Sequence, residues 1–204
     1  MIYLKNHKLI FIKAGRVGGS SFEVALSNFS NGKDIITPLN REEVRTNLGF
    51  AGPRNFKYSI YETFSISKIL FLKHLLKGEL PRKYYNHMPA TEIKKRIGEK
   101  IWNNCIKISI IRNPFDQIIS SFYRTVKKNN LKNLDFNKYY LENQYLLSWN
   151  HRHYEIEGKN IIDFFIRFEN FEEDILNLEN KIPGLKGIYK IFRNINAAPY
   201  PGSR

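Results

Sequence analysis

The chain is poor in the residues that mark secreted, membrane-spanning and metal-binding proteins. Its 204 residues include one cysteine, Cys105, which excludes an internal disulfide and a cysteine-based metal site and is typical of a reducing compartment. No apolar run is long enough to cross a membrane. The N-terminus lacks the apolar segment and small-residue cleavage site of a secretory signal. We therefore expect a cytoplasmic protein without a transmembrane segment.

Acidic residues are scarce as well. The chain has 19 Asp and Glu against 33 Lys and Arg, which gives a formal net charge of +14. Such an excess predicts polyanionic partners: nucleic acid, anionic lipid, an acidic glycan or a multiply phosphorylated cofactor. No run of Lys and Arg is longer than the one at residues 94–96, so there is no strong evidence for nucleic acid. The alternative explanation of the net charge is that lysines are spread over the whole surface without a specific partner.

Linkers, internal repeats and low-complexity segments are absent too, and the hydrophobic content of 42% is ordinary for a globular protein. The chain is long enough to enclose a hydrophobic core. Apolar runs rich in β-branched residues alternate with segments of helical period. The sequence therefore predicts one α/β domain over residues 1–204.

The first informative stretch is residues 9–23. It opens with an apolar run that predicts a buried strand. A tight turn that brings the backbone close to a ligand is then permitted by three glycines, Gly15, Gly18 and Gly19. Ser20 and Glu23 have the spacing of a capping box, which predicts that a helix begins there. Its free N–H groups, with Arg16, Ser20 and Ser21 beside them, suit a phosphate-like group. A merely structural strand–turn–helix is the alternative.

Two common nucleotide fingerprints are missing from this stretch. The pattern GxxxxGK[ST] is absent, and so is GxGxxG. An ordinary nucleoside triphosphate site and a dinucleotide site are therefore both without support.

The second informative stretch is residues 105–124. Residues 105–111 form a predicted strand, and Asn113 and Pro114 then have the residue types of a helix cap and a first helical position. Arg112 is thereby placed at the carboxyl edge of the sheet, where open α/β sheets bind ligands. Its guanidinium matches a phosphate, and Ser120 can complete the grip. The helical face predicted to be buried carries Phe115, Ile118, Ile119 and Phe122, with Ser120, Tyr123 and Arg124 on the other face.

The rest of the chain predicts further elements. Strands are expected at residues 2–4, 34–37 and 161–168, and helices at 40–47, 60–77, 90–97, 135–149 and 170–179. Asn40 is the expected cap of the second helix, and Pro89 the first residue of the 90–97 helix. From residue 183 onward we expect irregular chain. His151 and His153 are interpreted as surface residues of a polar loop, since no third ligand has metal spacing near them.

These segments together resemble the sulfotransferases that use 3′-phosphoadenosine 5′-phosphosulfate (PAPS), and the carbohydrate-type members most. Residues 13–23 are similar to the family's 5′-phosphosulfate loop, often written PKTAGTS. Residues 112–123 are similar to its 3′-phosphate segment, RNPxDRxxSxY. Residues 166–174, IRFENFEED, are similar to a late structural signature, IRYENLEED. The three segments cover about a fifth of the chain, in the family's order.

The resemblance implies a fold, a cofactor and a reaction. The fold is a P-loop-like parallel sheet with helices on both faces, and residues 38–100 are an acceptor-side insertion. The cofactor is PAPS, with adenosine 3′,5′-bisphosphate (PAP) as the product and no metal. The reaction moves the sulfuryl group to an acceptor hydroxyl, on a carbohydrate such as a glycan or glycolipid. The implied cofactor-binding residues are Arg16, Val17, Gly18, Gly19, Ser20, Ser21, Arg112 and Ser120.

Three residues depart from the family pattern. Arg16 stands where the loop has Lys, Gly15 where it has Pro, and Gln117 where the second segment has its second basic residue. Arginine keeps the charge and the donors but does not give up a proton readily. We therefore expect Arg16, backed by Lys13 and the loop amides, to stabilise charge on the departing oxygen.

The acceptor hydroxyl needs a general base, and His87 is our candidate because its pKa suits the task. It also lies shortly before the Arg112 strand, where carbohydrate-type relatives place a catalytic histidine. An ordinary loop histidine is the alternative, and Glu62 is a weaker candidate base. Other functions also stay open: a kinase-like P-loop protein, a nucleotide binder without catalysis, or a nucleic-acid-binding module.

Overall fold

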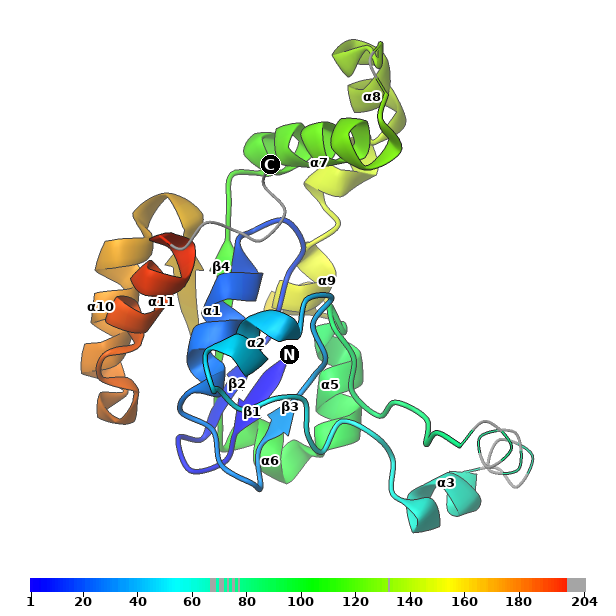
Figure 1. The fold of residues 1–204 in the computed structure, drawn as a ribbon, viewed down its shortest axis with the longest axis vertical. Helices are drawn as coiled ribbons and strands as arrows, with labels where there is room; N and C mark the ends of the chain where they lie inside the picture. The colour runs from blue at the N-terminus through cyan, green and yellow to red at the C-terminus, as the bar shows by residue number, and fades with distance from the viewer. Residues whose placement is uncertain are drawn as a thin grey trace.

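The computed structural model describes residues 1–66, 69, 72, 74, 76, 78–131 and 133–197 (Figure 1). Its main sheet has the strand order β3-β1-β2-β4-β7. The strands are β1 (Ile2–Leu4), β2 (Leu9–Phe11), β3 (Ile35–Ile36), β4 (Ile106–Ile111) and β7 (Phe164–Arg167). A separate hairpin joins β5 (Glu155–Ile156) to β6 (Lys159–Asn160).

The sheet is mixed, which corrects the parallel sheet expected from the sequence. Strands β2, β4 and β7 are parallel, as expected, whereas β1 is antiparallel to both β2 and β3. Residues 5–8 form a tight turn between β1 and β2. So short a connection can join only antiparallel strands, because a parallel pair needs a long crossover.

Helices lie on both sides of the strands (Figure 1). On one side, α10 (Phe171–Lys181) and α11 (Ile188–Ala197) pack together and α11 packs on α1 (Gly19–Ser27). On the other lie α5 (Ala90–Ile97) and α9 (His151–Tyr154). The remaining helices are α2 (Glu43–Asn47), α3 (Ile60–Ile66), α6 (Glu99–Asn103), α7 (Pro114–Asn129), α8 (Phe136–Glu142), η1 (Gln144–Leu147), η2 (Phe168–Asn170) and η3 (Pro183–Leu185).

The core explains why the C-terminal part is helical, where we expected irregular chain. Ile188, Phe192 and Ile195 have helical spacing and are buried. The ring of Phe192 packs edge-on against Phe22 of α1, with centroids 6.2 Å apart. The basic residues of α11 lie on its other face, which is the usual pattern of an amphipathic helix.

The junction of β4 with α7 is as predicted, but the buried face of α7 is not. The Asn113 side chain accepts a hydrogen bond from the Phe115 N–H at 2.9 Å, and Pro114 occupies the first turn. However, Phe115 is 58% exposed and Ile119 40% exposed. The residues of α7 that are buried are Gln117, Ile118 and Ser121. Because α7 projects beyond the end of the sheet, only this stripe is covered (Figure 1).

Several predicted boundaries also shift. Helix α2 follows Glu42 rather than Asn40, and Pro89 caps α5 instead of starting it. The predicted helix at 135–149 is divided at Asn143 into α8 and η1. The strand at 161–168 shortens to β7, and the helix at 170–179 becomes α10. Of the helix predicted at 60–77, α3 covers the first part, and residues 67, 68, 70, 71, 73, 75 and 77 lie outside the described residues.

Glu23 does not form the predicted capping box. Helix α1 begins after Gly18 with no side-chain cap, and Glu23 is fully buried beneath it. Its carboxylate lies 2.8 Å from the Lys13 ammonium, 3.5 Å from the Arg45 guanidinium and 3.1 Å from the Met1 amine. A buried carboxylate is tolerated only where such partners compensate for lost hydration. Glu23 therefore joins α1, β1 and α2 beneath the loop.

This cluster predicts acid sensitivity. Burial alone would raise the pKa of Glu23, but the Met1 amine, Lys13 and Arg45 outweigh it and lower the pKa from 4.5 to about 2. The unfolded chain therefore binds a proton that the folded protein does not between those pH values, so this contribution is present above pH 4.5 and is lost as pH falls toward 2. Glu23→Gln should cost about 3–5 kcal/mol at pH 7, because it removes the carboxylate that balances the buried Lys13 ammonium and that shares the Arg45 guanidinium with Glu42. Urea unfolding from pH 7 to 3 measures both effects.

The matched control is Glu99→Gln, because Glu99 forms an exposed ion pair with Lys94 at 3.4 Å. It should change stability by less than about 1 kcal/mol. Equal loss of stability below pH 4.5 in the native protein and in Glu23→Gln would contradict the assignment of the acid sensitivity to Glu23.

Candidate functional site

The loop between β2 and α1 has the conformation of an anion-binding turn. Arg16 and Gly18 both have left-handed backbones, with φ values of 62° and 75°. Alternating backbone of this kind directs successive N–H groups toward one point, next to the positive end of α1. A side chain at Gly18 would lie 3.0 Å from the ring of Phe168 and 3.1 Å from that of Phe171. Glycine is therefore required there both for its backbone and for space.

Arg112 follows the carboxyl end of β4 and lines the same pocket as the loop between β2 and α1. Its guanidinium carbon lies 4.0 Å from the centroid of the Phe168 ring, a cation–π contact. Its Nε is buried and, in the part of the chain that the structure describes, has no hydrogen-bond partner. A buried donor without a partner is rare and points to a ligand oxygen.

One pocket of about 330 Å³, which we call the loop pocket, gathers the two predicted binding segments. Arg112 and Ser120 line it together with loop residues Arg16, Gly18, Gly19, Ser20 and Ser21. Its described wall is completed by Lys13, Ala14, His87, Arg124 and Phe168. Of the predicted cofactor-binding residues, Val17 alone is not among the lining residues, since its side chain belongs to the hydrophobic core. The carboxyl ends of β2 and β4 thus bring the two segments to one site.

A chain of four hydrogen bonds connects the segments. The Asn150 amide accepts from the Gly15 N–H at 2.8 Å and donates to the Gly15 carbonyl at 2.9 Å. It also donates to the Gln117 side-chain oxygen at 2.6 Å, and Gln117 donates to the Arg112 carbonyl at 2.8 Å. Asn150 and Gln117 are both buried. We call this set the Asn150–Gln117 bridge; it also shows what Gln117 does in place of a basic residue.

Lys13 and Arg16 differ in their freedom to act. Lys13 is 3% exposed, and its ammonium is held by Glu23 at 2.8 Å. Arg16 is half-buried, and burial together with nearby Arg124 lowers the pKa of its guanidinium. In the described part of the chain Arg16 forms no ion pair, whereas the charge of Lys13 is balanced. Arg16 is thus the cation of the loop whose charge faces the pocket.

His87 lies at the meeting point of the loop pocket and two neighbouring pockets. Its backbone is left-handed, with φ 56°, and its carbonyl accepts a hydrogen bond from His153 Nε2 at 3.1 Å. His153 is therefore fully buried on α9, which corrects the expectation of a surface loop residue. His87 Nδ1 has no partner among the described residues. Burial, with Lys13 next, lowers the pKa of His87 to about 4, so the ring is neutral near pH 7.

Glu62, the weaker candidate base, lies elsewhere. Its carboxylate is bound by the Lys83 ammonium at 2.6 Å, and that hydrogen bond lowers the pKa of Glu62. It lines none of the three pockets, and α3, which carries it, projects far from the loop (Figure 1). The structure therefore removes Glu62 from the candidate site.

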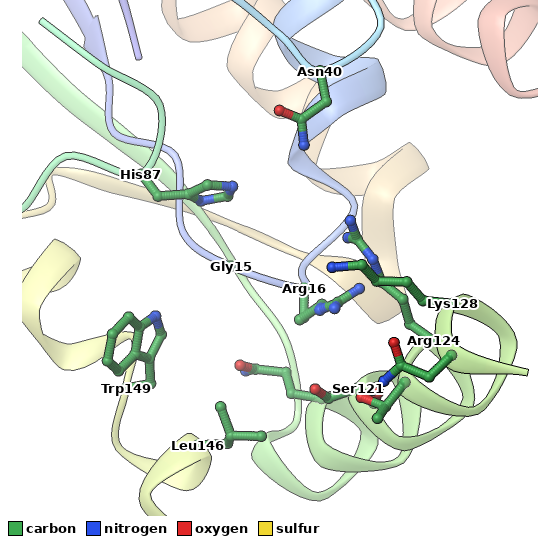
Figure 2. Close-up of a pocket in the computed structure, with 12 residues that line it drawn as sticks. Gly15, Arg16, Asn40, His87, Ser121, Arg124, Lys128, Leu146 and Trp149 are labelled. Carbon is green, nitrogen blue, oxygen red and sulfur yellow. Dashed lines mark hydrogen bonds between the residues drawn. The ribbon is translucent and has the colours of Figure 1, made fainter. Parts of the chain in front are cut away.

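Two larger pockets adjoin the loop pocket. The Trp149 pocket, of about 530 Å³, is lined by Trp149 and Leu146 on one side and by Arg16, Arg124 and Lys128 on the other (Figure 2). The Val44 pocket, of about 480 Å³, lies between α1, α2 and α7. Both include Asn40, His87, Arg124 and Lys128.

Several of these residues were not assigned to the site from the sequence. Arg124 was expected on the same helix face as Ser120 but was given no role, and it lines all three pockets. Trp149 ends the aromatic helix expected at 135–149, whose rings could line an acceptor groove or belong to the core, and Asn150 lies just beyond that segment. Phe168 lies in the third family-like segment, which gave no hint of contact with the loop.

Comparison with known proteins gives a relative but no function. No protein-family model matches the chain, and no solved structure matches it. The chain is similar to a protein of Archaeoglobus fulgidus described as an uncharacterized protein, with 32% identity over 100 residues, or 47% of this chain and 82% of that protein. Since the chain covers most of the archaeal protein, the two belong to one family.

In the part of the chain that is described, no helix has the length and apolar character needed to cross a bilayer. Nor do three or more His, Cys, Asp or Glu residues gather among the described side chains as ligands of a metal ion.

Proposed function

We propose that this protein is a PAPS-dependent sulfotransferase that moves a sulfuryl group to an acceptor hydroxyl, with a carbohydrate as the acceptor. One observation supports it above the others. The two segments that resemble the phosphosulfate and 3′-phosphate sites, residues 13–23 and 112–123, are far apart in the sequence, yet both line the loop pocket. A nucleotide that carries a phosphate at each end needs two such sites at a fixed separation.

The loop pocket fits such a nucleotide chemically. The amides of residues 18–21 and the Arg16 guanidinium suit the 5′-phosphosulfate. Arg112, with its unpartnered Nε, and the Ser120 hydroxyl suit the 3′-phosphate. No Asp or Glu lines the pocket among the described residues, so nothing there repels an anion. When bound, PAPS supplies an activated sulfuryl group on a phosphate leaving group.

The protein's own groups then have three tasks. Arg16 and the loop amides stabilise the charge that develops on the leaving phosphate, as preorganised donors do in an oxyanion hole. Arg112 and Ser120 hold the far end of the nucleotide and so orient it. His87, neutral and with a free Nδ1, accepts the proton of the acceptor hydroxyl. Its position where all three pockets meet supports this role, because the base must contact both the donor and the acceptor.

PAP should raise the melting temperature of the protein, because a ligand that binds only the folded state stabilises it. At 100 times its dissociation constant the gain is about 2.7 kcal/mol. Arg16→Ala and Ser120→Ala should each remove most of the shift, since each loses a phosphate contact. Differential scanning fluorimetry measures it.

Lys138→Ala is the matched control, because Lys138 is exposed on α8 and lines none of the three pockets. It should keep the full shift. A flat melting curve with saturating PAP would reject the proposal, and a shift with ATP but not with PAP would favour a kinase-like protein instead.

His87→Asn should stop sulfate transfer while keeping the PAP-induced shift, because asparagine tolerates the left-handed backbone but cannot act as the base. The acid limb of kcat/KM for the native protein should lie near pH 4 rather than near 6.5, since the base must be unprotonated and its pKa is lowered. Release of PAP from PAPS with mixed oligosaccharide acceptors measures both. Unchanged turnover in His87→Asn would show that His87 is not the general base.

A further inference from the structure

The two pockets beside the loop pocket are strongly basic. Among the described residues no Asp or Glu lines either of them. Their walls carry Arg16, Arg41, Arg124, Lys127 and Lys128, besides Lys13. In so electropositive a cavity, an uncharged acceptor would leave several cations uncompensated when it displaced water and counter-ions.

The charges of Arg124 and Lys128 are not balanced by a carboxylate in the described structure. Arg124 and Lys128 form no ion pair with any described residue, whereas the buried cations Lys13 and Arg45 are held by Glu23 and Glu42. Arg124 also lies close enough to Arg16 to lower its pKa. Two guanidinium groups that repel each other at a pocket wall are stabilised by an anion between or beside them.

The second cation is too far along α7 to serve the nucleotide's 3′-phosphate. Ser120 and Lys128 are eight residues apart on one helix, about 12 Å along its axis at 1.5 Å per residue. Lys128 lines the Trp149 and Val44 pockets but not the loop pocket. Its partner is therefore a different anion from the one that Ser120 contacts.

The opposite wall suits a saccharide. The Trp149 indole and Leu146 face the cations across the Trp149 pocket (Figure 2). Aromatic rings of this kind pack against the apolar face of a sugar ring, and the Asn40 and Asn129 amides, which are exposed, suit its hydroxyls. The basic groups gather around two open pockets of limited volume rather than along an extended strip, which favours a short acidic saccharide over nucleic acid.

We propose that the acceptor is an acidic saccharide, bearing a carboxylate or sulfate near the reacting hydroxyl, and that Arg124 and Lys128 bind this anion in the Trp149 pocket. The assignment rests on the proposed sulfotransferase function, since it treats the loop pocket as the donor site.

Calorimetric titration of the PAP-saturated protein with a heparin-derived tetrasaccharide tests it. The tetrasaccharide should bind, and its desulfated, carboxyl-reduced counterpart should bind at least tenfold more weakly. Lys128→Ala should weaken the acidic ligand about tenfold, the usual loss for one hydrogen bond to a charged group. It should leave PAP affinity unchanged, because Lys128 is not in the loop pocket. Lys138→Ala makes the same charge change on α8 and should have no effect.

The outcomes separate the two proposals. Absence of PAP binding overturns the sulfotransferase proposal. Titration of the free protein with the acidic tetrasaccharide then still tests the anion site in the Trp149 pocket. The acidic acceptor is overturned if PAP binds but the neutral tetrasaccharide binds as tightly as the acidic one. It is also overturned if PAP binds and Lys128→Ala leaves the affinity for both tetrasaccharides unchanged. An oligonucleotide of equal charge that binds more tightly and displaces the tetrasaccharide would overturn it in favour of nucleic acid.

The Asn150–Gln117 bridge carries a second inference, independent of the acceptor. Its hydrogen bonds join the Gly15 backbone to the Arg112 backbone through two buried side chains. The loop and the start of α7 are otherwise linked through the paired strands that precede them. We infer that Asn150 and Gln117 are positioning residues that fix the separation of the two phosphate sites; this too rests on the proposed function.

A ligand with two phosphates depends on that separation, and a ligand with one does not, because a second contact gains from effective concentration only when the sites match the span. Gln117→Ala should therefore weaken PAP about tenfold while 5′-AMP and 3′-AMP change less than twofold. Titration calorimetry with the three nucleotides measures this. Gln144→Ala, an exposed glutamine of η1, should change none of them.

Asn150→Ala breaks the bridge from its other end and keeps the test available if Gln117→Ala does not fold. Equal weakening of all three nucleotides would indicate a general loss of structure, and no change in PAP affinity would show that the bridge is not needed. Either result overturns the positioning role. Failure of PAP to bind the native protein would instead overturn the sulfotransferase.

Discussion

The parallel pairing of β2 with β4 is the constraint on which the candidate site depends. Leu9, Ile10 and Phe11 pair with Ile106, Lys107 and Ile108, so the two strands end at the same edge of the sheet. Past that point the Ile12 N–H donates to the Ile108 carbonyl at 2.9 Å, and the Ser109 hydroxyl donates to the Ile12 carbonyl at 2.6 Å. The glycine loop and Arg112 therefore begin side by side, and every later contact between them refines a position that the sheet has already set.

Beneath that edge, charge is balanced where it is buried and unbalanced where it faces a pocket. Glu23 offsets Lys13 and Arg45 inside the fold, at a site where an unpaired charge would be costly. Arg16, Arg112 and Arg124 face the pockets without a described carboxylate partner. The positive charges that face the pockets are therefore not used to balance buried carboxylates of the fold. The net charge of +14 alone therefore does not locate a binding site, because the same charge could be spread over a solvated surface.

Local signals predicted the strands of the main sheet, although β7 is shorter than expected, and the junction of β4 with α7. Asn113 and Pro114 form the cap of α7 because their preferences act within a few residues. Features that depend on contacts between residues far apart in the sequence were not predicted. Glu23 has the spacing of a capping box, yet Lys13 and Arg45 draw it inward. Asn150 contacts Gly15 across 135 positions of the sequence, a pairing that no local pattern can show. Of the α7 residues predicted to be buried, Ile118 is, but Phe115 and Ile119 are exposed because the sheet ends before it can cover them.

The Phe168 ring gives the third segment a physical meaning that its sequence alone did not. One part of this ring lies against the position that a side chain at residue 18 would need, and the Arg112 guanidinium stacks on its face. A single aromatic residue thus packs against both the glycine loop and Arg112. Replacement of Phe168 would therefore change the surroundings of Gly18 and of Arg112 together.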